Sequence, residues 1–295
     1  MMTLSHTVCA LLVVAFILVP AMSCAQEKLN RPYFVTYDHY LEERDSLEIA
    51  TAPVLGRDDA INSFWGGWTE FEYGVRQWWT TTLYLDWQHT RHEKSAFTGL
   101  RFENRLRLFR EEHRINPVIY IEYEHLDEAD KTIKEVVGFD GTAQLSEPLS
   151  ETRKEHKREI ETRLILSSQI GQWNIAQNFI GEKGLTGGQW EFGYAVGFWR
   201  PLAPATGRRC AFCAESFAAG AEFYGGSGDW SNFTLTGTSH YAAPVIAWTL
   251  PSETTIRVSP GWGLTSDSVQ TLFRIGVSQE LDNVSHWIGK AFRRN

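Results

Sequence analysis

The chain has 295 residues, a formal net charge of −8 and 13% aromatic residues. This acidic balance, without a recurring basic patch, argues against nucleic-acid binding. The contents of Gly and Pro are too ordinary for a disordered or collagen-like chain. Twelve Trp and 17 Phe are many for a soluble acidic domain, because so many large rings must be buried or exposed for a function.

The N-terminus has the pattern of an export signal. Residues 8–19 (VCALLVVAFILV) form an apolar run that is too short to span a membrane as a helix, although the residues before it contain no Lys or Arg. Ser23-Cys24-Ala25 is a small-x-small cleavage site, which predicts a signal peptide over residues 1–25. Lipid attachment at Cys24 is the alternative, and Ala21 fits it poorly.

The remaining chain alternates apolar and polar residues with a period of two. In residues 100–108 (LRFENRLRL), one alternation is apolar except at Asn104, and the other is entirely ionic. A helix would show no apolar stripe over this stretch, so the pattern predicts a strand with one apolar and one charged face.

Twelve segments share this pattern, and each is about ten residues long. They are residues 47–54, 65–75, 79–88, 97–108, 117–125, 159–170, 173–182, 190–199, 217–224, 241–250, 255–263 and 271–281. Residues 33–41 are either a thirteenth strand or an extended lead-in. Residues after 281 are the first with the pattern of a short amphipathic helix.

Three features favour a membrane barrel over a β-sandwich. The segments have the length that a tilted strand needs to cross a bilayer, Trp residues lie near their ends, and the connections alternate between short and long. Residues 200–216 depart from this pattern, since they form a long connection on the short side. We predict an all-β, transmembrane, antiparallel up-and-down β-barrel of about 12 strands in the bacterial outer membrane. Its parts are a signal peptide (1–25), an N-terminal lead-in (26–46), the barrel (47–281) and a C-terminal periplasmic tail (282–295).

Phrases such as GGWTEFEYGVRQWW, FTGLRFENRLRL and FRIGVSQEL resemble bacterial outer-membrane β-barrel proteins. Specifically, they are similar to the poorly characterised transporter-type barrels grouped near the phenol-degradation outer-membrane family. The resemblance covers most of the chain from about residue 47 and rests mainly on the alternation. It implies transport of small solutes and transfers no catalytic residues.

The charged alternation predicts which side chains line the lumen. They are Glu70, Glu72, Asp86, Arg101, Glu103, Arg105, Arg107, Glu122, Glu124, Glu159, Glu161, Arg163, Arg257 and Arg274. Because acids outnumber bases, an open lumen would favour cations or neutral polar solutes. The alternative is an ionic ladder that fills a small barrel and conducts nothing.

Cys210 and Cys213 are the two cysteines left after the signal peptide is removed, and in an oxidising compartment this spacing predicts a disulfide. Metal or redox chemistry at this pair is the alternative, although no second Cys or His pair accompanies it. We expect no metal site and no cofactor elsewhere, and no hydrolase or phosphate-binding motif is present.

Residues 126–158, the longest loop, would either constrict the barrel or cover it, and their basic run at 153–158 would lie near lipopolysaccharide phosphates or in solvent.

The sequence therefore predicts a passive outer-membrane channel or transporter for small polar or cationic solutes, without enzymatic activity. A secreted soluble β-sandwich that binds polysaccharide and an outer-membrane lipid hydrolase are the alternatives. The expected partners are outer-membrane lipid, lipopolysaccharide and small solutes but no nucleic acid, and assembly as a homo-oligomer stays open.

Overall fold

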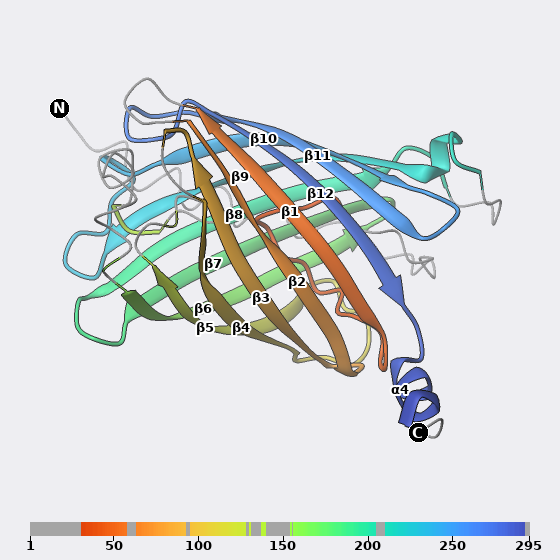
Figure 1. The fold of residues 1–295 in the computed structure, drawn as a ribbon. Helices are drawn as coiled ribbons and strands as arrows, with labels where there is room; N and C mark the ends of the chain where they lie inside the picture. The colour runs from red at the N-terminus through yellow and green to blue at the C-terminus, as the bar shows by residue number, and fades with distance from the viewer. Residues whose placement is uncertain are drawn as a thin grey trace.

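In the computed structural model, twelve antiparallel strands close into one barrel (Figure 1). The structure describes residues 31–57, 63–92, 95–127, 130, 137–139, 154, 156–204 and 210–292. The strands are β1 (Leu47–Arg57), β2 (Phe64–Arg76), β3 (Trp79–Thr90), β4 (Ser95–Arg107), β5 (Asn116–Asp127), β6 (His156–Ile170), β7 (Trp173–Gly184), β8 (Trp190–Pro201), β9 (Phe217–Asp229), β10 (His240–Thr249), β11 (Thr254–Gly263) and β12 (Thr271–Leu281).

Each strand pairs with its neighbours in the chain, and β1 pairs with β12 from Leu47↔Leu281 to Arg57↔Thr271. This last pairing removes both edges of the sheet, so the backbone groups of the outermost strands are paired as a lipid environment requires. All twelve predicted segments are strands, which confirms the up-and-down barrel. The soluble β-sandwich is wrong, because the strands of the described residues form one closed ring and no second sheet packs against it.

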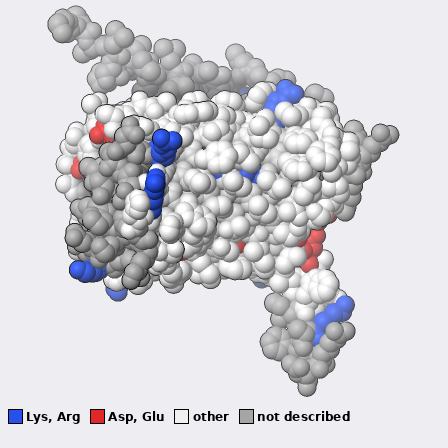
Figure 2. Space-filling model, turned by 45° about the horizontal axis from the view of Figure 1, so that its top comes forward, with Lys and Arg blue, Asp and Glu red and all other residues white. Residues whose placement is uncertain are grey.

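The period-two pattern separates the outside of the barrel from the inside. On β4, Leu100 and Phe102 are 39% and 47% exposed, whereas Arg101, Glu103 and Arg105 are buried. The outer wall visible in Figure 2 carries few charged residues, and the larger charged patches lie toward its two ends. An apolar outside with a charged inside reverses the arrangement of a soluble protein and suits a surrounding lipid.

Asn104, the polar residue on the apolar face of β4, has a hydrogen-bond partner. The indole Nε1–H of Trp79 donates to Asn104 Oδ1 over 2.9 Å. Trp79 is the first residue of β3, so the pair lies near one end of the barrel, at the depth where Trp residues are common. The strand register around Asn104 is regular. Neither a partner subunit nor a register shift is needed to satisfy this side chain.

We name the two ends of the barrel by its connections. The terminal end is where β1 begins and β12 ends, and the loop end is the opposite one. Most turns at the terminal end are short, such as residues 77–78 and 171–172, and Gly171 adopts a positive φ of 60° in its turn. The connection over residues 202–216 is longer, as the sequence indicated. It contains the 3₁₀ helix η1 (Ala214–Ser216).

The loop predicted over residues 126–158 lies largely outside the described residues. Of its described part, the Gly138 amide donates to the carbonyl of Phe192 over 3.0 Å, and Gly138 forms a β-bridge with Gly228. This point of the connection between β5 and β6 therefore lies against β8 and β9 at the loop end.

A helix, α4 (Val284–Phe292), follows β12 and projects from the terminal end (Figure 1). Asp45 holds its first turn: the carboxylate accepts the backbone N–H of Ser285 at 2.9 Å and its hydroxyl at 2.6 Å. This contact ties the start of the barrel to the tail that follows its last strand. No helix among the described residues is both long and apolar enough to cross a membrane.

Candidate functional site

Residues 31–46, which we call the inner segment, lie inside the ring of strands (Figure 1). They form no strand, so residues 33–41 are the extended lead-in rather than a thirteenth strand. Backbone N–H groups of Phe34, Val35 and Thr36 donate to the Glu222 carboxylate on β9 over 3.0, 2.9 and 2.6 Å. A buried segment without a strand partner needs such acceptors, because unpaired buried amides are costly.

Other strands hold the inner segment from different sides of the ring. Asn178 on β7 accepts the N–H of Tyr37 at 2.7 Å and donates to its carbonyl at 2.8 Å. Arg163 on β6 donates to the carbonyl of Val35 at 2.9 Å, and Thr80 on β3 accepts the N–H of Glu42 at 3.1 Å. Contacts from β3, β6, β7 and β9 place the inner segment across the centre of the barrel.

His39 anchors the inner segment near the terminal end. Its backbone N–H donates to Ser167 Oγ over 2.9 Å, its Nδ1 also contacts that oxygen, and its Nε2 lies 2.9 Å from Glu112 Oε1. Burial raises the pKa of Glu112, but the His39 hydrogen bond and charge outweigh it and hold that pKa below its usual value.

The order Ser167–His39–Glu112 is that of a hydrolytic triad. His39 and Ser167 are both buried, however, and neither lines the cavity described below. Ser167 Oγ already accepts the backbone N–H of His39. Because His39 and Ser167 are buried away from that cavity, we interpret the three residues as an anchor of the inner segment, and they give the lipid-hydrolase alternative no support.

The side chains predicted to line the lumen occupy the inner face of the wall. Buried ones are Glu70, Glu72, Asp86, Arg101, Glu103, Arg105, Glu122, Glu124, Glu161, Arg163 and Arg274, and half-buried ones are Arg107, Glu159 and Arg257. Charges of opposite sign alternate among them, so ion pairs form within the wall.

Arg101 lies between two carboxylates, with Nε 3.1 Å from Asp86 Oδ2 and Nη1 2.9 Å from Glu122 Oε1. Arg105 bridges Glu103, at 2.7 Å, and Glu72. A buried charge is tolerated only beside an opposite charge, and each of these arginines has two carboxylate neighbours.

A cavity of about 240 Å³ separates the inner segment from part of the wall. The inner segment contributes Asp38, Glu42 and Glu43, and the wall contributes Glu48, Glu70 and Glu72, together with three arginines and several aromatic rings. Sequence reasoning missed the acids of the inner segment. The sequence did contain an indication of them. Residues 33–41 have polar and aromatic residues on both alternations, so neither side of this segment is apolar enough to face lipid.

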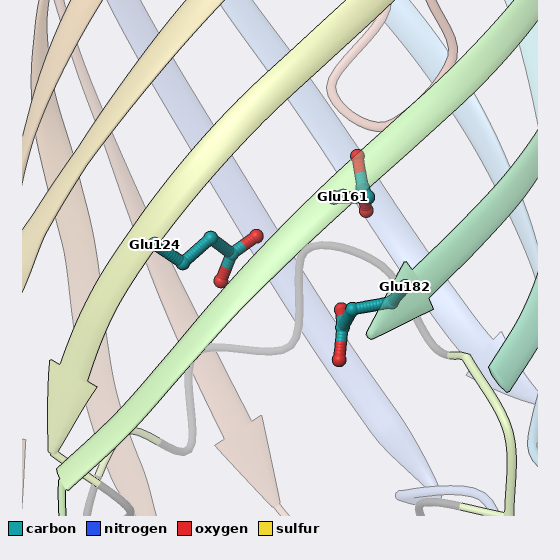
Figure 3. A group of neighbouring side chains, drawn as sticks. All are labelled: Glu124, Glu161 and Glu182. Carbon is teal, nitrogen blue, oxygen red and sulfur yellow. The ribbon is translucent and has the colours of Figure 1, made fainter. Parts of the chain in front are cut away.

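Three carboxylates from adjacent strands also meet inside the barrel: Glu124, Glu161 and Glu182, from β5, β6 and β7 (Figure 3). One oxygen atom of each lies within 4.8 Å of the others. Glu161 is already paired with Arg163 at 2.7 Å. The cluster adds negative potential to the interior, and three carboxylates alone do not define a metal site.

Cys210 and Cys213 form a disulfide, with Cα atoms 5.5 Å apart, in the long connection at the terminal end. The neighbouring carbonyl of Ala211 accepts the indole N–H of Trp248 at 2.6 Å, which docks the connection onto β10. The bond leaves no thiolate at either residue for a metal.

Together, the closed ring, the apolar outside and the ionic inside define a bacterial outer-membrane β-barrel. Such a barrel is stable only with lipid around its apolar wall, so the protein resides in the bacterial outer membrane.

No protein-family model matches the sequence, and no curated protein is similar enough to match it. Among solved structures, the COG4313 outer membrane channel from Pseudomonas putida F1 is similar, with a TM-score of 0.52 and 9% identity over 83% of this chain and 98% of the other. The NanC porin has a TM-score of 0.49 with 10% identity, over 80% of this chain and 100% of the porin. The KdgM porin has a TM-score of 0.47 with 8% identity, over 79% and 97%. At these identities the likeness concerns the fold, and the resemblance to the phenol-degradation family stays a prediction.

Proposed function

We propose that the protein is an outer-membrane channel for small polar or cationic solutes. The observation that carries this proposal is the charged cavity between the inner segment and the wall of the barrel. A barrel whose interior served only to hold strands together would fill this space with side chains, as small barrels do. The inner segment then narrows the path and limits the size of the solute.

The preference for cations follows from the charges that face the interior. Arg101 and Arg105 each touch two carboxylates, and the Glu124, Glu161 and Glu182 cluster adds further negative charge. In a narrow path with low-dielectric walls, such an excess raises the local concentration of cations and repels anions.

Single-channel recording tests this proposal. The refolded protein is inserted into planar bilayers with a KCl gradient, and the reversal potential is measured. We expect a reversal potential whose sign shows that K⁺ passes more readily than Cl⁻. An absence of conductance would identify the interior as a filled ionic ladder, and an anion-selective potential would contradict the charge argument.

Contacts with lipopolysaccharide are part of the same proposal. Of the basic run at 153–158, Lys154 is exposed and lies in the connection at the loop end. Basic side chains there would meet phosphate groups of the outer leaflet. Replacing the basic residues of this run with Gln should weaken co-purification of lipopolysaccharide, and an unchanged amount would refute the contact.

A further inference from the structure

The cavity beside the inner segment contains buried polar atoms that lack a hydrogen-bond partner among the described residues. Three of them are Oδ2 of Asp38, Oγ1 of Thr36 and Nε1 of Trp199, and all three residues line the cavity. Others belong to Glu72, Arg105 and Arg257, whose side chains form ion pairs with one another or with Glu70. The exposed fractions of Asp38, Thr36 and Trp199 are 0%, 4% and 1%. Buried polar groups are nearly always hydrogen-bonded, so three such atoms around one cavity indicate a polar occupant.

The charges around the cavity specify the sign of that occupant. Six carboxylates and three guanidinium groups line it. The guanidinium groups already have acidic neighbours: Arg31 lies 3.3 Å from Glu42, Arg257 lies 3.9 Å from Glu70, and Arg105 contacts Glu72. The excess is negative, and Asp38 is the fully buried member of it, with Arg31 no closer than 3.9 Å. A cation is therefore favoured over an anion or a neutral molecule.

Aromatic rings indicate that the cation is organic. Tyr33, Trp68 and Trp199 line the cavity, and each of these residues is buried. Ring faces attract cations and pack against apolar groups, whereas a hydrated metal ion prefers oxygen ligands. A cavity of about 150 Å³ can hold benzene, so a volume of about 240 Å³ is enough for a compact amine with one ring.

We propose that this cavity binds a small organic cation, with its ammonium group on Asp38 and Thr36 and an acceptor atom, if present, on the indole N–H of Trp199. The site deepens the channel function proposed above and rests on it for its role, as a binding step on the path of the solute. Water can satisfy the unpartnered atoms, but it leaves the excess negative charge unbalanced.

Isothermal titration calorimetry on the refolded full-length protein in detergent tests the site with three probes of matched shape. Benzylamine carries a positive charge, benzyl alcohol is neutral, and benzoate is negative. Benzylamine is expected to bind at least tenfold more tightly than benzyl alcohol, and benzoate is expected not to bind. Equal binding of benzylamine and benzyl alcohol would overturn the proposal.

Variants locate the binding. Asp38→Asn keeps the shape of the side chain and its acceptor for the Tyr40 N–H, and should weaken benzylamine binding at least tenfold. Glu111→Gln is the matched control, because Glu111 is exposed in a turn at the same end and lies outside the cavity. Unchanged binding in Asp38→Asn, or equal losses in both variants, would refute the site. Heat-modifiable gel mobility shows whether Asp38→Asn folds. If it does not, Thr36→Val tests the site instead: we expect a severalfold loss of benzylamine affinity, and an unchanged affinity would refute the site.

Planar-bilayer currents from the same preparation separate the two proposals. Benzylamine binding without any conductance would overturn the channel and leave the site standing. Conductance with no selective, Asp38-dependent benzylamine binding would overturn the site and leave the channel standing.

Discussion

Glu222 accepts the backbone N–H of Thr36 over 2.6 Å, although the two residues are 186 positions apart in the chain. The same carboxylate also accepts the N–H groups of Phe34 and Val35. One buried side chain on β9 therefore satisfies three consecutive amides of the inner segment. Hydrogen bonds to charged groups contribute about 1.5–3 kcal/mol each. With three of them, we expect Glu222 to contribute more than any other described side chain to holding the inner segment inside the barrel.

Replacing Glu222 should loosen the inner segment without opening the barrel. In Glu222→Ala, the three amides lose their acceptor, so we expect the segment to leave the interior more often and the single-channel conductance to rise. Cleavage of residues 31–46 by added protease, followed by mass spectrometry, should become faster as well. Glu111→Gln serves as the control for lost charge. Wild-type conductance together with wild-type protease resistance would show that Glu222 does not hold the segment.

Arg101 should be important for stability, because it lies between Asp86 and Glu122. Removing one partner of a buried ion pair typically costs about 3–5 kcal/mol, since the remaining charge is left uncompensated. Arg101→Met should therefore lower the free energy of unfolding by about that amount, measured by urea titration in micelles. Arg76→Met, in an exposed position at the end of β2, should change it little. Similar values for both variants would contradict the ion-pair argument.

The Trp79–Asn104 hydrogen bond provides a test on the lipid-facing side. Trp79→Phe removes the indole donor and leaves the Asn104 amide facing lipid without its partner, at an expected cost of about 1–3 kcal/mol in unfolding free energy. Adding Asn104→Leu should recover much of that loss, because no polar group then remains unpaired. A double variant no more stable than Trp79→Phe alone would show that lost ring packing, rather than the hydrogen bond, sets the cost.

Docking of α4 should depend on pH through Asp45. Hydrogen bonds from the Ser285 hydroxyl and backbone N–H lower the pKa of this carboxyl. A depressed pKa in the folded state stabilises the docked helix above the ordinary carboxyl pKa, and this stabilisation is lost as the pH falls through the lowered value. Protection of the Ser285 amide from hydrogen exchange, corrected for intrinsic rate, should thus decrease under strongly acidic conditions.

Asp45→Asn gives the control for this titration. The variant should show weaker protection at neutral pH and no further change on acidification, since Asn does not titrate in this range. Acid-dependent loss of protection that persists in the variant would assign the titration to another group.

The barrel was predictable because its information is local. A strand that faces lipid on one side and charged neighbours on the other must alternate with a period of two, as Leu100 and Arg101 do, and this alternation is visible in any ten-residue window. The same alternation placed Glu72, Glu103 and Arg105 on the inward, charged face of their strands. Strand number and order then followed from the count of segments and the lengths of their connections.

The inner segment could not be placed in this way. The pattern of residues 33–41 fits either a strand or an extended lead-in. The side chains that accept hydrogen bonds from this segment, on Ser167, Asn178 and Glu222, lie more than a hundred positions further along the chain. No local window contains both partners of such contacts. The alternation along β9 assigns Glu222 to the inside of the barrel. It does not indicate that the carboxylate will accept hydrogen bonds from three backbone amides.

The alternation of residues alone thus specified a closed, membrane-spanning barrel with a charged interior, because lipid permits few other ways to pair the backbone. Only the folded chain decided what occupies that interior. The inner segment enters because buried acceptors such as Glu222 and Asn178 satisfy its amides, and the cavity beside Asp38 exists because that segment does not fill the ring completely.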